Sequence, residues 1–167
     1  MATALGMVYT QGGRIADALP LLSQALEQTR ATEWISLQAL CGLSVGEVQV
    51  RTGSLEEAHT CAERALALAR EHQERGNQAY ALRFLGDIAA HCDLPESVRA
   101  ESHYHQALAL AETLGMRPLQ AHCHLGLGTL WQRAGERQRA DEHLGVALKL
   151  FKEMGMLKWA DRVKALG

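Results

Sequence analysis

Apolar residues recur along the chain at steps of three and four positions, with charged residues between them. Four segments share this pattern and place alanine, leucine or tyrosine at matching points. The step is the period of one face of an α-helix, so each segment is predicted to be an amphipathic helix with a buried apolar face. The apolar positions are Ala18, Leu22, Ala25 and Leu26; Ala58, Ala62, Ala65 and Leu66; Ala100, Tyr104, Ala107 and Leu108; and Ala140, Leu144, Ala147 and Leu148.

A second kind of segment, with a glycine after an aliphatic residue, precedes each of these helices. These glycines lie 40, 40 and 42 residues apart, whereas the first alanines of the four stripes lie 40, 42 and 40 residues apart. The two series differ only in the third unit, so its connector at 91–96 is predicted to be two residues longer. The chain is therefore interpreted as four repeats of a helical hairpin, in which small residues let two backbones approach closely. The glycines are Gly6, Gly46, Gly86 and Gly128.

Glycine and proline mark the predicted helix ends, because glycine readily takes positive φ and proline at the start of a helix loses no hydrogen bond. Breaks within hairpins are predicted at Gly12-Gly13, Gly53-Ser54, Asp93–Pro95 and Gly135-Glu136. Helix caps between hairpins are predicted at Gly76, Gly115 and Gly155, and helix starts at Pro95 and Pro118. Pro20 is placed in the first turns of its helix, where its missing N–H costs least.

The predicted fold class is all-α, in one repeat domain over residues 1–167. Alanine and leucine dominate while aromatic residues make up 5%, a composition that favours helices over strands. Antiparallel helix pairs are expected at about 1–30, 33–73, 77–114 and 118–154, followed by a terminal helix at 157–166.

The repeat resembles the tetratricopeptide repeat, whose pattern is W-x-x-L-G-x-x-Y, then A-x-x-x-F, then A. The first repeat matches with Leu5-Gly6, Tyr9, Ala18, Leu22 and Ala25, and the fourth with Leu127-Gly128, Trp131, Gly135, Ala140, Leu144 and Ala147. Gln49 and Ala89 replace the tyrosine in repeats two and three, and the period of 40 exceeds the usual 34. The resemblance implies a right-handed superhelical solenoid that binds a protein or peptide in its concave groove.

A narrower resemblance concerns the last two hairpins. The stretch 107–128 and the ending 154–159 resemble the C-terminal repeats of large bacterial regulators, which carry a nucleotide cyclase or transcription-factor domain and an AAA-type ATPase. This implies that the chain is the regulatory tail of a longer bacterial signalling protein, whose upstream domains are candidate partners. A parent protein of this kind could carry the enzymatic activity.

First helices line the groove in such solenoids. On these helices, the residues that lie outside the packing face are therefore the candidate partner-binding site. They are Met7, Leu43, Glu47, Arg51, Tyr80, Arg83, Asp87, His91, His122, Leu125, Thr129 and Arg133. Glu47 with Arg51 and Arg83 with Asp87 have the spacing of surface ion pairs on a helix. The basic, asparagine-rich groove with which some family members bind acidic tails is not matched.

No catalytic motif is present, and Gly126 and Gly128 are interpreted as packing glycines. Eight histidines are a weak signal for a metal, since no two have the i, i+4 spacing of a helical metal site. A His/Cys metal site around His122 or Cys123 would need ligands from adjacent helices and stays a remote alternative. The segment is expected to be no enzyme, to hold no cofactor or zinc, and to keep its four cysteines reduced.

A net charge of −2 without a run of like charge disfavours nucleic acid and anionic membranes as partners. The N-terminus lacks the features of a signal peptide, and no segment has the apolar length of a membrane span, so a cytoplasmic location is expected. The main alternative to partner binding is a homo-oligomerisation scaffold, in which Met1, Leu5, Met7 and Val8 pair with a second copy.

Overall fold

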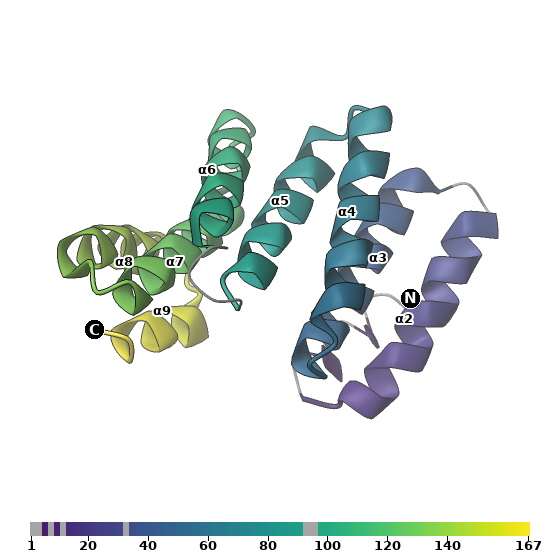
Figure 1. Cartoon of the computed structure of the whole chain (residues 1–167), viewed down its shortest axis with the longest axis horizontal. Coiled ribbons are helices and arrows are strands. Elements are labelled where there is room, and N and C mark those ends of the chain that lie inside the picture. The colour runs from purple at the N-terminus through teal and green to yellow at the C-terminus, as the bar shows by residue number, and fades with distance from the viewer. Residues whose placement is uncertain (1–4, 7–8, 11–12, 32–33, 92–96) are drawn as a thin grey trace. The chain divides into compact units, whose positions relative to one another are not determined.

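A computed structural model describes residues 5–6, 9–10, 13–31, 34–91 and 97–167 of the chain (Figure 1). The regular elements in this part are all α-helices, which confirms the predicted fold class of a helical repeat. They are α2 (Ile15–Ala31), α3 (Ile35–Arg51), α4 (Leu55–Glu71), α5 (Arg75–Ala89), α6 (Ser97–Thr113), α7 (Arg117–Arg133), α8 (Arg137–Glu153) and α9 (Leu157–Lys164). The terminal helix thus ends before the predicted Leu166, and Leu5, Gly6, Tyr9 and Thr10 are also helical.

Most turns between successive helices have the same construction. A residue with positive φ ends one helix, one residue follows, and the next helix begins. At the turn after α3, for example, Gly53 has φ +84° and the Ser54 N–H donates to the Gln49 carbonyl over 2.8 Å. This six-residue closure is a Schellman cap, which satisfies carbonyls left free at the helix end. The predicted glycines with this conformation are Gly13, Gly53, Gly115, Gly135 and Gly155.

Gly76 was a wrong prediction. It lies inside α5, and the positive φ of that turn falls on Gln73, at +56°. The cap is nevertheless complete, because the Glu74 N–H donates to the Ala69 carbonyl over 2.8 Å. The backbone therefore keeps the common turn even where its sequence signal is displaced by three residues.

The prolines have the places predicted for them where they are described. Pro118 lies in the first turn of α7 and Pro20 lies within α2. Gly12 and the connector with Asp93 and Pro95 lie outside the described residues.

The chain divides into two compact units, Met1–Phe84 and Leu85–Gly167, whose boundary falls within α5. In the N-terminal unit α2 packs on α3 and α3 on α4. Its core includes Ala18 and Leu22 of α2 with Val45 and Val48 of α3. All four residues are buried. For Ala18 and Leu22 this burial was predicted, because both belong to the apolar stripe of α2.

Bare glycine backbone receives large side chains in both units. A Cβ built on Gly6 would lie 2.6 Å from Leu22 Cγ, and one on Gly128 would lie 2.7 Å from Leu144 Cγ. A Cβ built on Gly46 would lie 2.6 Å from the Phe84 ring of α5 and 3.4 Å from the Ala58 carbonyl of the following helix α4. The close contact predicted between Gly128 and the next helix is confirmed, whereas the large side chain that covers Gly46 comes from α5.

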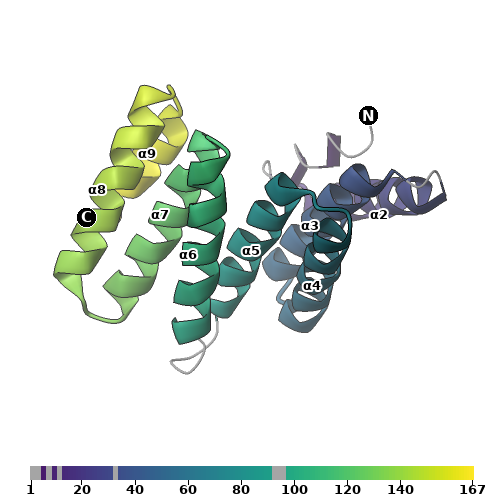
Figure 2. The ribbon, with the colours of Figure 1, turned by 90° about the horizontal axis from the view of Figure 1, so that it is seen from above.

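In the C-terminal unit α6 packs on α7, α7 on α8 and α8 on α9, and Figure 2 shows these helices side by side. The Tyr104 ring of α6 lies against two glycines, Gly86 of α5 and Gly126 of α7. Gly126 is therefore a packing glycine, as predicted. Phe151 of α8 is fully buried and stacks on Trp159 of α9, with ring centroids 5.9 Å apart.

Candidate functional site

The predicted binding residues fall into three environments, and Met7 lies outside the described residues. Leu43 and Leu125 are buried, with 7% and 8% of their surface exposed, which corrects their assignment to a binding surface. Leu125 packs in a cluster with Leu144 and Phe151 of α8. The physical reason is that a first helix contacts helices on more than one side, so the positions left over by its own hairpin are not all free.

Two charged members of the set, Glu47 and Arg83, are paired across helices. Arg83 of α5 lies 3.6 Å from Glu47 of α3, with 18% and 41% of the two side chains exposed. The pair therefore links two first helices of the N-terminal unit. This role differs from the pairing along one helix that the i, i+4 spacing predicts.

Four further candidates bond within the C-terminal unit. The Asp87 carboxylate accepts from the Tyr104 hydroxyl over 2.8 Å, and the Arg133 guanidinium donates to the Ala90 carbonyl. Thr129 donates to the Leu125 carbonyl over 2.9 Å, and His91 Nδ1 lies 2.7 Å from the Asp87 carbonyl. The bonds of Asp87 and Arg133 therefore connect neighbouring helices, whereas those of Thr129 and His91 stay within one helical segment.

His122 belongs to an aromatic cluster at the C-terminal end. Its ring centroid lies 4.4 Å from that of Trp159 and 5.1 Å from that of Phe151, both in edge-to-face geometry. The guanidinium of Arg162 also lies over the Trp159 ring, 5.2 Å from its centroid. Packing between α7, α8 and α9 therefore accounts for His122.

Two large side chains of the set stay exposed without a packing role of this kind. Arg51 is exposed at the last turn of α3, and 38% of Tyr80 is exposed on α5. Arg51 follows Glu47 by one helical turn and Tyr80 precedes Arg83 by about one turn. The Glu47–Arg83 pair thus fixes two helices that each present one large, exposed side chain in the N-terminal unit.

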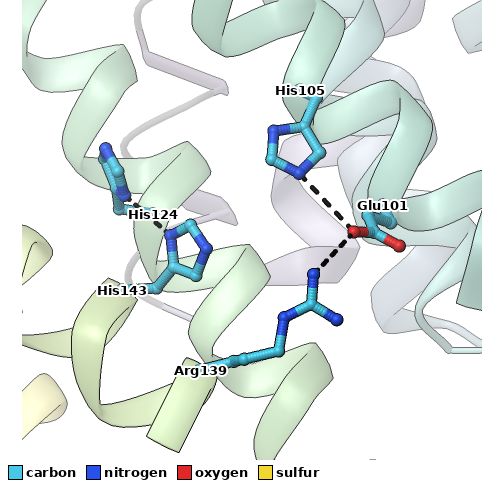
Figure 3. Close-up of polar contacts among 5 residues, drawn as sticks. All are labelled: Glu101, His105, His124, Arg139 and His143. Atoms are coloured by element: carbon cyan, nitrogen blue, oxygen red, sulfur yellow. Dashed lines mark hydrogen bonds and ion pairs between the residues drawn. The ribbon is translucent and has the colours of Figure 1, made fainter.

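A histidine cluster that the sequence did not predict lies in the C-terminal unit (Figure 3). His124 of α7 and His143 of α8 face each other with their Nδ1 atoms 2.9 Å apart. His105 of α6 lies nearby, its ring centroid 6.4 Å from that of His143. Histidine spacing along one helix could not reveal this cluster, because each ring comes from a different helix.

An acidic residue and an arginine complete this cluster. Glu101 of α6 lies 3.6 Å from His105 Nε2 and 3.4 Å from the guanidinium of Arg139 on α8 (Figure 3). The same guanidinium lies over the Trp131 ring, 3.5 Å from its centroid. Arg139 thus makes a cation–π contact and an ion pair at once.

The electrostatics of the cluster favour neutral imidazoles. The pKa of His124 is lowered from 6.5 to about 4, mainly by burial and then by the nearby His143 and His105. Burial also lowers the pKa of His143, with His105 and Arg139 acting in the same direction. Glu142 and Glu101 oppose this effect on His143. The rings of His124 and His143 are therefore suited to hydrogen bonding at neutral pH more than to carrying charge.

The arrangement of the candidate metal ligands and thiols can be stated for the described residues. There, no three His, Cys, Asp or Glu side chains are grouped so that they could hold a metal ion. Cys41 and Cys123 are buried thiols, and burial raises the pKa of the half-buried Cys61. A raised pKa disfavours the thiolate, which is the nucleophilic form.

Comparisons with known proteins bear on the fold first. No family model matches the chain. The crystal structure of BtubC (BKLC) from P. vanneervenii superposes on 92% of this chain and 63% of its own, with a TM-score of 0.71 and 20% identity. The chain is a helical repeat protein. At this identity the likeness concerns the fold alone.

A curated protein is also similar in sequence. The 43 kDa receptor-associated protein of the synapse from Tetronarce californica is 27% identical over 149 residues. The match covers 87% of this chain and 35% of that protein, so the chain spans about a third of its relative. In the described part of the chain, no helix is both long and apolar enough to cross a membrane.

Proposed function

We propose that this chain is a protein-interaction module of the tetratricopeptide type, which binds a protein or peptide partner through its first helices. The observation that carries the proposal is the pair of exposed side chains Arg51 and Tyr80 beside the Glu47–Arg83 ion pair. Arginine and tyrosine are enriched among the residues that dominate binding energy. A helical repeat that holds such side chains on a fixed frame suits partner binding.

The biological setting is a second part of the proposal. The resemblance of the last two hairpins to bacterial regulators favours a cytoplasmic regulatory segment that contacts upstream domains of its own parent protein. The name of the curated relative, a receptor-associated protein, also describes association with another protein. In this proposal the segment itself catalyses no reaction.

The proposal is tested with a double substitution, Arg51→Ala with Tyr80→Ala. The immobilised chain is used to capture partners from its source cells, mass spectrometry identifies them, and titration calorimetry measures the affinity of a purified partner. We expect at least a roughly tenfold loss of affinity, since each hot-spot side chain contributes more than about 1 kcal/mol. The melting temperature should stay nearly unchanged because both side chains are exposed.

Arg64→Ala with Arg70→Ala is the matched control, because both arginines are exposed on the second helix α4. Arg139 is unsuitable as a control, since it contacts Trp131 and Glu101. An equal loss of affinity in the control would place the binding surface on the second helices and contradict the proposal. Light scattering across a concentration series tests the alternative: a wild-type dimer with no captured partner would favour the oligomerisation scaffold.

A further inference from the structure

A pair of histidines joins α7 to α8 in the C-terminal unit. The part-buried contact between His124 Nδ1 and His143 Nδ1 is 2.9 Å long, and the ring centroids lie 5.2 Å apart. A hydrogen bond between two ring nitrogens needs one N–H and one lone pair. The bond can therefore form when both rings are neutral, or when one is protonated. It cannot form when both are protonated, because two N–H groups would then face each other.

Charged and titratable groups from the neighbouring helices surround this pair (Figure 3). On α6, His105 and Glu101 face it, and on α8, Arg139 and Glu142 act on His143. Arg139 repels a second proton, while the two glutamates attract it. Glu101 already lies within 4 Å of both Arg139 and His105, so much of its charge is compensated. Burial, His105 and Arg139 each outweigh the attraction of either glutamate for a proton on His143, so two adjacent imidazolium rings are not favoured.

We propose that the His124–His143 pair is a proton-sensitive latch, which holds α7 against α8 at neutral pH and weakens their packing in mild acid. The inference is independent of the proposed partner binding, because it concerns the stability of the C-terminal unit. Its basis is the geometry of the pair: two part-buried rings from different helices that share one hydrogen bond.

The direction of the pH effect follows from the two states. In the unfolded chain His124 has its ordinary pKa of 6.5, whereas in the folded chain its pKa is about 4. The unfolded state therefore binds more protons between these values, so stability is fully present above pH 6.5 and falls as the pH drops toward 4. The lowered pKa of His143 acts in the same direction.

The size of the effect is set by one to two protons. For His124 alone, the linkage relation gives a rise of roughly 20-fold in the unfolding equilibrium constant from pH 7 to pH 5. His124 is only partly buried, so solvent screening reduces this to on the order of tenfold.

The test is hydrogen exchange of the full chain at pH 7.5 and pH 5.0, corrected for the intrinsic exchange rate. His124→Asn with His143→Asn is the variant, because asparagine places hydrogen-bonding atoms near the Nδ1 positions and does not titrate. Histidine and asparagine also have similar helix propensities. His59→Asn is the control, since His59 is an exposed histidine on α4.

In the wild type and in the His59→Asn control, amides of α7 and α8 should lose about tenfold in protection at the lower pH. The double variant should lose much less. Equal losses in the double variant and the wild type, or no loss in the wild type, would overturn the proposal.

A measurement on the unmodified chain covers the case in which the double variant does not fold. Nuclear magnetic resonance of the imidazole rings should show that the pair takes up no more than one proton above pH 5. Ordinary titration of both His124 and His143 near pH 6.5 would contradict the latch, because ordinary titration means that the folded state does not resist protonation.

Discussion

At the residue scale, the large side chain that covers a packing glycine comes from different helices in different hairpins. The second-helix position that holds Leu22 and Leu144 in two hairpins holds Ala62 in another. There the ring of Phe84, from the next first helix, lies over Gly46 instead. The position equivalent to Phe84 in the last hairpin is Gly126, and Tyr104 lies over it. Close packing is kept because each large residue faces a glycine or alanine.

The glycine contact predicts opposite effects for two substitutions in the same hairpin. Gly128→Ala would place its Cβ 2.7 Å from Leu144 Cγ and 3.2 Å from the Leu144 nitrogen, so it should destabilise the chain by about 1–3 kcal/mol. Gly145 lies on α8, and a Cβ added there meets no atom within 4 Å, so Gly145→Ala should stabilise the chain by about 0.5–1 kcal/mol. Urea denaturation measures both. A stabilising Gly128→Ala would mean that the glycine register is misassigned.

The hydroxyl of Tyr104 gives a second prediction at this scale. It donates to the Asp87 carboxylate over 2.8 Å, while the ring is 2% exposed. Tyr104→Phe keeps the ring and removes a hydrogen bond to a charged group, which should cost about 1.5 kcal/mol. The exposed Tyr80 serves as the control, and Tyr80→Phe should stay within about 0.5 kcal/mol of wild type. Equal thermal melts of the two variants would contradict a structural role for the Tyr104–Asp87 bond.

Helix length and turn chemistry set the regularity of the repeat at the element scale. The helices α2, α3, α4, α6, α7 and α8 each have 17 residues. A Schellman cap closes the ends of α3, α4, α6, α7 and α8, and its positive-φ residue is glycine after all of these except α4. The cap needs one residue in the left-handed conformation. Glycine takes this conformation readily, whereas a residue with a Cβ is strained there.

Gln73 is the residue with which this strain can be tested. Its φ of +56° is unfavourable for a side chain with a Cβ, so Gln73→Gly should stabilise the chain by about 0.5–1 kcal/mol. Gly53→Gln makes the reverse change at the equivalent turn, where φ is +84°, and should destabilise by a similar amount. Calorimetry measures the melting temperatures of the two variants and of the wild type. A lower melting temperature for Gln73→Gly would show that glutamine contributes more than its backbone strain costs.

At the scale of the whole molecule, each unit is held together mainly by packing between helices that are close in sequence. In the C-terminal unit the main packing joins successive helices, α6 to α7, α7 to α8 and α8 to α9. Side-chain contacts also join α6 to α8 and α7 to α9. Repeat proteins of this kind have a stability that is close to a sum of local terms and neighbour terms. The α5 residues beside Tyr104 supply one such term to that unit.

Truncation tests this local additivity. A fragment of residues 75–167 keeps α5, so Tyr104 retains its contact with Gly86. A fragment of residues 97–167 loses that contact and the hydroxyl bond to Asp87. The longer fragment should fold, and by circular dichroism it should melt several degrees above the shorter one. Equal melting temperatures would show that α5 contributes nothing to the unit that begins at Leu85.

The sequence by itself determined the helices, the hairpin repeat and most of the turns. These features depend on local physics: the period of apolar residues marks a helix face, and glycine marks a left-handed cap. The fully buried alanines Ala18, Ala58 and Ala100 lie where the stripes place them. The displaced cap at Gln73 escaped prediction because a glutamine in the left-handed conformation leaves no sequence signal.

Only the tertiary structure decided which side chains are available for binding and which chemical groups meet. Leu43 and Leu125 were assigned to the same predicted groove as the exposed Arg51, yet they are buried. His124 and His143 are separated by 18 residues in the sequence, and their contact depends on how α7 lies against α8. A one-dimensional pattern fixes the face of a helix, but a pairing between helices depends on rotation and distance, which packing sets.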